Sequence, residues 1–453
     1  MKQIKPRKLH LNKLIDIANS GNDGQAEVNQ HFISQLNDQN IDNTKIQALK
    51  NAFVESKVLM IYGAAGTGKT TLMNYISTMM DGCSKLFLTK THTALENMKR
   101  RIKSPGLIHE FMGIDSFVKS TVDSDYDVIF VDECSTIDNR TMVRLLEKVG
   151  DGSLLVLAGD IYQIESIDFG NWFFYAKEIV QEKAIVELDN TWRTNEPTIK
   201  DLWEEVRFLR PIITEKLVIN GPFSEDIGKN IFTNRDEDEV VLCLNYDGKF
   251  GLNSINSYFQ DANPSQKAYY WSEWKYKIGD PILFNENKRF PMLYNNLKGV
   301  IVDIQNDLNS IKFIIDIPIN LTAVRVRGSD LEIVSRNNNS TRIAFSVYAN
   351  DDNQADEEYE VARMKSIIPF QLAYAVSIHK AQGLEYNSVK IVIPQSNSER
   401  ITHGVFYTAI TRTKQKLKIY WSPETMTDVI AGFDEAQRNK ISLDIIKQLV
   451  VNN

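Results

Sequence analysis

The chain has 453 residues, and its 52 Lys and Arg residues against 59 Asp and Glu residues give a formal net charge of −7. With 43% hydrophobic and 25% charged residues it has a globular composition, which excludes a disordered, collagen-like or small disulfide-stapled chain. The length predicts several domains of about 100 to 200 residues each.

The sequence contains no apolar run long enough to span a membrane, which would take about 18 residues, and Asp16 interrupts the basic amino terminus before any apolar region. We therefore expect a soluble, cytoplasmic protein without a membrane partner. Cys83, Cys134 and Cys243 lie far apart, without CxxC or histidine spacing, so neither a zinc site nor a disulfide framework is expected. The negative net charge argues against a wholly basic nucleic-acid coat but allows a local basic channel.

A polar extension covers residues 1–40, and the predicted elements begin with a helix from Thr44. Short apolar strands then alternate with helical stretches, which predicts a parallel sheet covered on both faces. The strands are expected at Val58–Tyr62, Leu86–Leu88, Val128–Val131, Leu154–Ala158 and Ile185–Leu188, with helices at Thr70–Met80 and Thr141–Val149.

A second α/β unit is predicted from the apolar runs Val240–Leu244, Val389–Ile393 and Leu417–Trp421. The segment from about 257 to 365 differs, because it carries short β-rich runs with turn signals and little helix. Such runs predict a small barrel inserted into the second unit. They lie at Pro281–Phe284, Gly299–Ile304, Ile311–Ile315 and Thr322–Val326.

A phosphate-binding pattern, GxxxxGK[ST], follows the first predicted strand and opens a predicted helix. Its glycines let backbone N–H groups close around phosphates, Lys69 reaches the β- and γ-phosphates, and the Thr70 hydroxyl ligates Mg²⁺. A plain glycine-rich loop is the alternative, but it would not require this flanking context. The residues expected to bind ATP here are Gly63, Ala64, Ala65, Gly66, Thr67, Gly68, Lys69, Thr70 and Thr71.

Polar residues at the ends of later elements complete a hydrolytic site. Asp132 and Glu133 end an apolar strand 63 residues after Lys69, and we expect Asp132 to hold Mg²⁺ and Glu133 to orient water. Gln163 follows another strand and is a candidate contact of the γ-phosphate. Hydrolysis without a covalent intermediate also needs a cation at the γ-phosphoryl group, for which Arg193 and Arg412 are candidates. Each of these side chains alone is typical of a surface, so the interpretation depends on their combination.

The motifs GAAGTGKT, VDECS, GDIYQ, NTWRTN, SIHKAQGLEY and FYTAITRTK occur in this order, and together they resemble those of superfamily 1 helicases, most closely the RecD-like, 5′ to 3′ branch. The resemblance covers about Thr44 to Trp421. It implies an α/β fold of two RecA-like P-loop NTPase cores with a small SH3-like β-barrel inserted in the second. The implied limits are 41–186 for core 1, with a small insertion at about 95–125, 187–256 with 366–453 for core 2, and 257–365 for the barrel.

The resemblance also implies roles for individual residues. Gln47 would read the adenine, Gly383 and Glu385 would line the nucleotide cleft, and Arg193 and Arg412 would be arginine fingers. The implied catalytic set is Lys69, Asp132, Glu133, Gln163, Arg193 and Arg412, with ATP and Mg²⁺ as cofactors. The residues implied to contact a single strand are Thr91, His92, Ser116, Phe117, Ser377 and His379.

The segment from Lys85 to Lys119 favours strand binding, because it carries seven basic and three acidic residues inside an acidic protein. Phosphates attract the cations, and unstacked bases stack on the aromatic rings between them. A solvated amphipathic helix would carry similar charges, so that interpretation stays open. Only 40 residues lie between Thr91 and Asp132, which leaves little room for a hairpin that splits duplexes.

The favoured hypothesis is an ATP hydrolase and helicase that moves 5′ to 3′ on single-stranded nucleic acid, with DNA favoured over RNA. A nucleotide-dependent switch or assembly subunit that does not translocate is the alternative from another class, since P-loop architecture alone permits it. An RNA-directed helicase and a protein partner in a larger complex also stay open.

Overall fold

The computed structural model describes residues 56–433 apart from positions 81, 104–105, 107, 122–125, 151–152, 165–171, 181, 228–230, 232–235, 237, 287 and 350–362. The extension 1–40, the predicted helix from Thr44 and Gln47 therefore lie outside the described residues. The chain divides into two compact units. Unit 1 is Met1–Lys216, Glu399–Gln415 and Thr427–Asn453, and unit 2 is Leu217–Ser398 and Lys416–Met426. The domain limits expected from the sequence stay a prediction.

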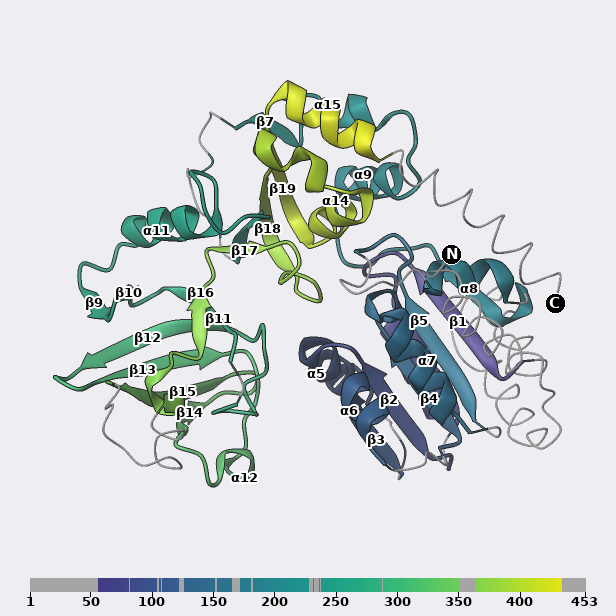
Figure 1. The fold of residues 1–453 in the computed structure, drawn as a ribbon, viewed down its shortest axis with the longest axis horizontal. Coiled ribbons are helices and arrows are strands. Elements are labelled where there is room, and N and C mark those ends of the chain that lie inside the picture. The colour runs from purple at the N-terminus through teal and green to yellow at the C-terminus, as the bar shows by residue number, and fades with distance from the viewer. Residues whose placement is uncertain are drawn as a thin grey trace. The chain divides into compact units, whose positions relative to one another are not determined.

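The described part of unit 1 is built on a six-stranded parallel sheet with the strand order β3-β2-β4-β5-β1-β6 (Figure 1). Every residue of β1, β2, β4 and β5 is buried, as expected for parallel strands covered on both faces. The five strands predicted here are confirmed, and β3 is an additional one. The strands are β1 Val58–Gly63, β2 Lys85–Thr89, β3 His109–Gly113, β4 Val128–Asp132, β5 Leu154–Gly159 and β6 Ile185–Leu188.

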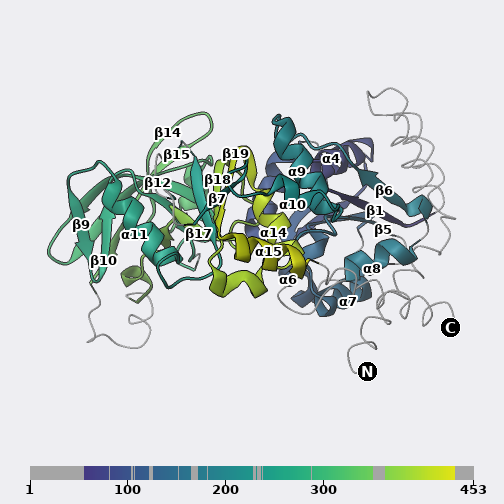
Figure 2. The ribbon, with the colours of Figure 1, turned by 90° about the horizontal axis from the view of Figure 1, so that it is seen from above.

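Helices cover both faces of this sheet. The alternating side chains of the strands form two buried clusters, one packed against α6, α7 and α8 and the other against α4 and α5. Figure 2 shows α4 and α7 on opposite sides of β1 and β5. The two helices predicted in this region are confirmed as α4 and α7. The bounds are α4 Lys69–Met79, α5 His92–Arg101, α6 Ile114–Lys119, α7 Asn139–Lys148 and α8 Trp172–Ile179.

The segment 95–125, which the resemblance implied to be a small insertion, contains one strand of the first sheet, β3. β3 pairs in parallel with β2 from Lys85↔His109 to Thr89↔Gly113. The Phe111 ring stacks on Phe87 with centroids 4.5 Å apart, which gives this edge strand an apolar anchor. The segment therefore extends the sheet at its edge.

Unit 2 contains most of a second sheet, five-stranded among the described residues, with the order β17-β8-β18-β19-β7. The pairs β17–β8, β18–β8 and β19–β7 are parallel. Helix α11, Leu252–Ala262, is fixed to β17 by the Asn256 side chain, which accepts from the Ala375 N–H at 2.9 Å and donates to its carbonyl at 3.2 Å. The three strands predicted for this unit are confirmed as β8, β18 and β19. The bounds are β7 Ser224–Asp226, β8 Glu239–Cys243, β17 Ala375–Ser377, β18 Tyr386–Val392 and β19 Thr413–Trp421.

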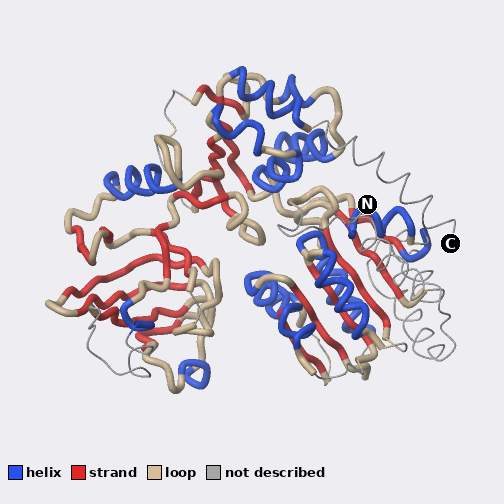
Figure 3. Tube along the Cα trace, viewed as in Figure 1, coloured by secondary structure: helices blue, strands red, loops and turns tan. Residues whose placement is uncertain are grey.

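The chain between α11 and β17 is mainly antiparallel β-structure (Figure 3). Its described residues form a hairpin, β9 Ala268–Trp271 with β10 Trp274–Lys277, and a six-stranded sheet with the order β14-β15-β13-β12-β11-β16. Aromatic and aliphatic side chains from both sheets share one core. The strands of the larger sheet are β11 Pro281–Phe284, β12 Lys298–Asn306, β13 Ser310–Ile317, β14 Glu332–Arg336, β15 Thr341–Tyr348 and β16 Phe370–Leu372.

The β-rich character predicted for this insertion is confirmed, and so are three of its four predicted strands. The fourth is wrong, because Ala323–Val326 form the short helix α12. None of its residues is buried, and Val324 is 82% exposed. The β-branched valines predicted a strand there, but Val326 packs only partly buried against the core of the insertion and the segment joins none of the described sheets.

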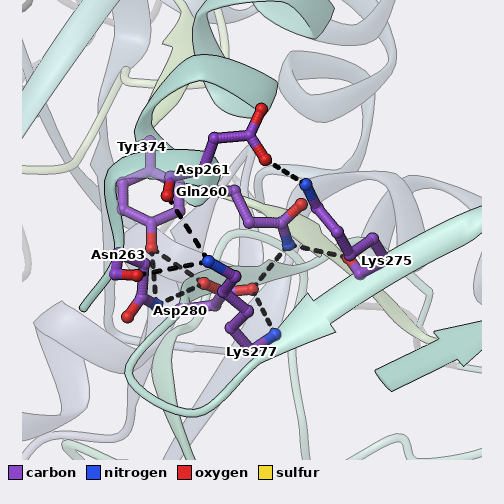
Figure 4. Close-up of polar contacts among 7 residues, drawn as sticks. All are labelled: Gln260, Asp261, Asn263, Lys275, Lys277, Asp280 and Tyr374. Carbon is purple, nitrogen blue, oxygen red and sulfur yellow. Dashed lines mark hydrogen bonds and ion pairs between the residues drawn. The ribbon is translucent and has the colours of Figure 1, made fainter. Parts of the chain in front are cut away.

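A buried aspartate fastens the insertion to α11 and to the chain entering β17 (Figure 4). Asp280 is fully buried and accepts hydrogen bonds from Gln260 Nε2 at 2.6 Å and from Asn263 Nδ2, the Tyr374 hydroxyl and the Lys277 N–H at 2.8 Å each. A carboxylate can be buried when donors satisfy its oxygens in this way. Asp280 is therefore the polar anchor at the start of the larger antiparallel sheet.

Asp280→Ala should lower the free energy of unfolding by about 3 kcal/mol or more, because it removes the shared acceptor of four donors, of which those of Gln260 and Tyr374 belong to buried residues. Urea denaturation followed by tryptophan fluorescence measures this. Asp261→Ala is the matched control, since it removes an exposed carboxylate of α11 that pairs with Lys275; its effect should stay within about 0.5 kcal/mol. Equal losses in the two variants would contradict the anchoring role.

Candidate active site

The residues from Gly63 to Thr70 form the turn between β1 and α4. Gly66 and Gly68 have positive φ angles of 76° and 92°, a conformation that L side chains rarely adopt. A Cβ at Gly66 would also lie 2.4 Å from Arg193 Cβ. No side chain caps the N-terminus of α4. Its first N–H groups therefore remain for an anion, as phosphate binding requires.

Lys69 and Thr70 are the first two residues of α4. Lys69 contacts the beginning of the turn, and Thr70 contacts the end of β4. Lys69 Nζ donates to the carbonyl oxygens of Gly63 and Ala64 at 2.9 Å each. Desolvation lowers the pKa of Lys69, while nearby carboxylates favour its charged form. Thr70 Oγ1 donates to Asp132 Oδ2 at 3.0 Å. A hydroxyl and a carboxylate oxygen, the kind of ligands that Mg²⁺ prefers, are thus already in contact.

Glu133 occupies an unusual backbone position directly after β4. Its φ is 57°, which is uncommon for a residue with a side chain, and its N–H donates to Asp132 Oδ1 at 2.9 Å. Burial raises the pKa of Glu133 and so does Asp132, while Lys69, Arg412 and Arg193 oppose this rise. A carboxylate with a raised pKa among cations is suited to orienting water and accepting its proton.

The turn after β5 supplies two further polar groups. Gln163 is 6% exposed, and its Oε1 has no hydrogen-bond partner among the described residues. The same holds for Oδ2 of Asp160, which is 1% exposed. Buried polar atoms are normally paired, so these two fit a site where a ligand or water supplies the partner.

Two arginines meet at the carboxyl end of α14, His403–Ile410. Arg193 Nη1 donates to the Thr411 carbonyl at 2.7 Å, and Arg412, which is 2% exposed, donates from Nε to the Thr408 carbonyl at 2.9 Å. Both guanidinium groups act on the pKa of Glu133. Unit 1 alone therefore brings together Lys69, Asp132, Glu133, Gln163, Arg193 and Arg412.

The segment that carries Arg193 also braces the phosphate-binding loop, which the sequence analysis missed. The Trp192 N–H donates to the Gly66 carbonyl and Thr191 Oγ1 donates to the Ala65 carbonyl, each at 2.8 Å. The Trp192 side chain is 79% exposed and offers an aromatic face beside the loop. The sequence signal that could have indicated this contact is Trp192, which directly precedes the candidate catalytic residue Arg193.

The predicted strand contacts of unit 1 divide into exposed and buried residues. Thr91 and His92 are exposed at the start of α5, where Thr91 Oγ1 accepts from the Ala94 N–H at 3.2 Å. Ser116 is exposed on α6. Phe117 is 3% exposed and lies within the core, so its ring has no face for a base. This prediction fails because Phe117 is on the side of α6 that packs on the sheet.

Ion pairs reduce the positive charge of the basic segment 85–119. Lys85 is fully buried, Lys90 pairs with Asp115 at 3.0 Å, and Lys99 pairs with Glu96 at 2.7 Å. The exposed cations are Arg100, Arg101, Lys103 and Lys119.

The remaining predicted residues belong to unit 2. Ser377 is 6% exposed, and its Oγ accepts from the Lys380 N–H at 3.2 Å. His379 is exposed. Gly383 has a φ of 78°, and the Glu385 carbonyl accepts from Lys298 Nζ at 2.7 Å.

No group of three or more His, Cys, Asp or Glu side chains in the described part of the chain is placed to hold a metal ion. No helix among the described residues has the length and apolar character needed to cross a membrane.

The parallel sheet, the uncapped α4 and the Lys69–Asp132–Glu133 arrangement define a P-loop nucleoside triphosphatase. An AAA domain model matches residues 41–211, and a UvrD-like helicase C-terminal domain model matches residues 372–420. In these matches, as in its motifs, the chain is similar to the RecD-like branch of superfamily 1 helicases.

Similar proteins are distant in sequence. The RecBCD enzyme subunit RecD of Buchnera aphidicola subsp. Acyrthosiphon pisum is 22% identical, over 81% of this chain and 70% of that protein. The ATP-dependent RecD2 DNA helicase of Deinococcus radiodurans is 20% identical, over 80% of this chain and 46% of that protein. The crystal structure of Pif1 helicase from Candida albicans aligns with a TM-score of 0.49 at 14% identity, over 91% of this chain and 99% of that one.

Glu133→Gln should lower kcat for ATP hydrolysis by about 100-fold or more, because an amide cannot accept a proton from water. Because the pKa of Glu133 is raised, its carboxylate is lost at a higher pH than an ordinary glutamate would be. The kcat of the unaltered protein should therefore begin to fall above the usual titration range of glutamate as the pH is lowered. Steady-state kinetics across pH measures both effects.

The matched control is Glu147→Gln, an exposed residue of α7, which should leave kcat unchanged. Nucleotide affinity, measured with a fluorescent ATP analogue, should change little in either variant. A collapse of that affinity in Glu133→Gln would show that Glu133 is a ligand and not the group that activates water.

Proposed function

We propose that this chain is an ATP-dependent helicase or translocase that moves 5′ to 3′ along single-stranded DNA. The observation that carries the proposal is the meeting of the phosphate-binding loop, the Asp132–Glu133 pair and two arginines within unit 1. The similarity to an ATP-dependent RecD2 DNA helicase supports DNA as the strand.

Each residue of the site has a proposed part in hydrolysis. The N–H groups of the loop and Lys69 bind the phosphates, and Glu133 orients water for attack on the γ-phosphoryl group. Thr70 and Asp132 would hold Mg²⁺, which neutralises phosphate charge when bound. Arg193 and Arg412 stabilise the charge that develops in the transition state. The amide of Gln163 contacts the γ-phosphate.

The two parallel sheets are proposed to be two RecA-like cores, and the antiparallel insertion an SH3-like barrel. The supporting observations are the single apolar core shared by the insertion's strands and the position of that insertion between β8 and β17 of the second sheet. The proposed limits are 41–186 for core 1, 187–256 with 366–453 for core 2, and 257–365 for the barrel.

Strand contact is proposed at the carboxyl ends of strands in both units. Thr91 and His92 follow β2, and Ser377 and His379 lie at and just after the end of β17. Hydroxyl and imidazole groups are suited to hydrogen bonds with backbone phosphates. Ser116 completes the set, and the exposed cations Arg100, Arg101 and Lys119 add attraction for phosphates.

A nucleotide-dependent switch that does not translocate is the competing function. One experiment separates the two: ATP turnover with and without single-stranded DNA, followed by displacement of streptavidin from biotin at either end of the oligonucleotide. We expect stimulation of turnover by about tenfold or more and faster clearing of the 3′ end, since movement is proposed to be 5′ to 3′. Lys69→Ala is the control and should abolish both activities.

Clearing of the 5′ end alone would contradict the proposed direction. Stimulated turnover without clearing of either end would favour the switch. Stimulation by RNA and not by DNA would overturn the proposed substrate.

A further inference from the structure

A buried arginine outside the catalytic set is linked through Glu187 to the strand that enters the phosphate-binding loop. Arg207 ends α9, Pro197–Arg207, and is 3% exposed. Its Nη2 lies 3.4 Å from Glu187 Oε1, and Glu187 Oε2 accepts from the Tyr62 hydroxyl at 2.6 Å. Tyr62 and Glu187 are register partners in β1 and β6, and Tyr62 directly precedes Gly63. Arg207 is therefore connected through Glu187 to the residue that directly precedes the loop.

The same guanidinium lies over the turn that carries Gln163. Arg207 Cζ is 5.1 Å from the centroid of the Tyr162 ring, within the range of a cation–π contact. Tyr162 is the residue before Gln163, and its N–H donates to Asp160 Oδ1 at 3.1 Å. A shift of the Tyr162 ring would therefore move the backbone from which the Gln163 amide projects.

Helix α14, which leads into Arg412, packs against the same group of side chains. The Tyr162 ring meets His403 and Tyr407 of α14 edge to face, at centroid distances of 6.2 and 6.4 Å. α9 and α14 are joined by hydrogen bonds from His403 Nε2 to the Val206 carbonyl at 2.7 Å and from Trp203 Nε1 to the Ile410 carbonyl at 3.1 Å. The contacts of Arg207 thus connect β1, the Gln163 turn and α14.

Packing alone would not require a charged side chain at the buried position of Arg207. Glu187 is the acidic partner of Arg207, but its side chain is 42% exposed, and Arg207 Nε has no hydrogen-bond partner among the described residues. A buried ion pair is often no more stable than apolar side chains of similar volume. What the guanidinium adds is a planar, charged surface that stacks on Tyr162 while it contacts Glu187.

We propose that Arg207 is a positioning residue for nucleotide hydrolysis. It holds the Tyr162 ring, and through it Gln163, in register with the phosphate-binding loop and with the helix that leads to Arg412. Recognition of the γ-phosphate therefore depends on Arg207, whereas binding of the β-phosphate by Lys69 and the loop does not. The inference rests on the proposed function, since it takes ATP as the ligand of this site.

Arg207→Gln tests this dependence through two comparisons with the unaltered protein, one of kcat and one of the affinity for an ATP analogue relative to the affinity for ADP. Relative to the unaltered protein, kcat should fall by about tenfold or more, as is typical when the support of an active group is removed. The affinity for a non-hydrolysable ATP analogue should fall severalfold while the affinity for ADP stays within about twofold. Arg207→Lys keeps the charge without the planar stacking surface, so it should restore only part of the loss.

Arg210→Gln is the matched control, because Arg210 lies three residues further on, pairs with Glu205 and has a side chain that is 49% exposed. It should leave kcat and both affinities unchanged. Tyr162→Leu removes the stacking partner while it keeps the Arg207–Glu187 ion pair, and it should give the same pattern as Arg207→Gln if that variant does not fold.

Equal weakening of ADP and of the ATP analogue would overturn the proposal, since it would mean that Arg207 supports the fold of the whole loop. Unchanged kcat and affinities in the folded variants would overturn it as well. The ratio of affinities needs no turnover, so it tests the role of Arg207 even if the unaltered protein fails to hydrolyse ATP, an outcome that would contradict the proposed function instead.

Discussion

Charges of both signs crowd the carboxyl edge of the first sheet, and the site depends on their mutual neutralisation. Burying a single charge is costly, but cations and carboxylates in contact make the arrangement possible. This balance acts on the pKa of Glu133, which burial raises and the cations restrain, and on the pKa of Lys69, which desolvation lowers and the carboxylates oppose. The groups concerned are Lys69, Arg193 and Arg412 on one side and Asp132, Glu133 and Asp160 on the other.

Parallel strand order explains how residues so distant in the chain meet. The strands β4, β5, β1 and β6 are neighbours in the sheet and end at the same edge. Their carboxyl ends and the segments that follow carry Asp132, Asp160, the phosphate-binding loop and Arg193 in that spatial order. Ligands of open α/β sheets bind at this edge for the same reason. The brace from Trp192 to Gly66 and the stack of Arg207 on Tyr162 tie these neighbouring segments to one another.

Local signals predicted five of the six strands of the first sheet and the positions of the loop and the acidic pair of the candidate site. The phosphate-binding loop and the acidic pair are each recognisable from a few consecutive residues after a buried strand. The loop at Lys69 and the Asp132–Glu133 pair could therefore be located from the sequence. Features that depend on packing could not. The core position of Phe117, the helix at Ala323–Val326 and the contacts of Arg207 follow from which face of an element meets its neighbour, and the sequence alone does not give that face.

The central claim is that Arg412, which follows α14, stabilises the charge that develops on the γ-phosphoryl group during hydrolysis. Arg412→Ala tests this claim most directly. Exposed Arg400→Ala is the matched control, and the thermal unfolding of both variants checks that they fold. With Mg²⁺ and single-stranded DNA present, the kcat of Arg412→Ala should fall by about 10³-fold while the affinity for ATP changes only severalfold. An unchanged kcat, or an equal loss of affinity and turnover, would contradict the account.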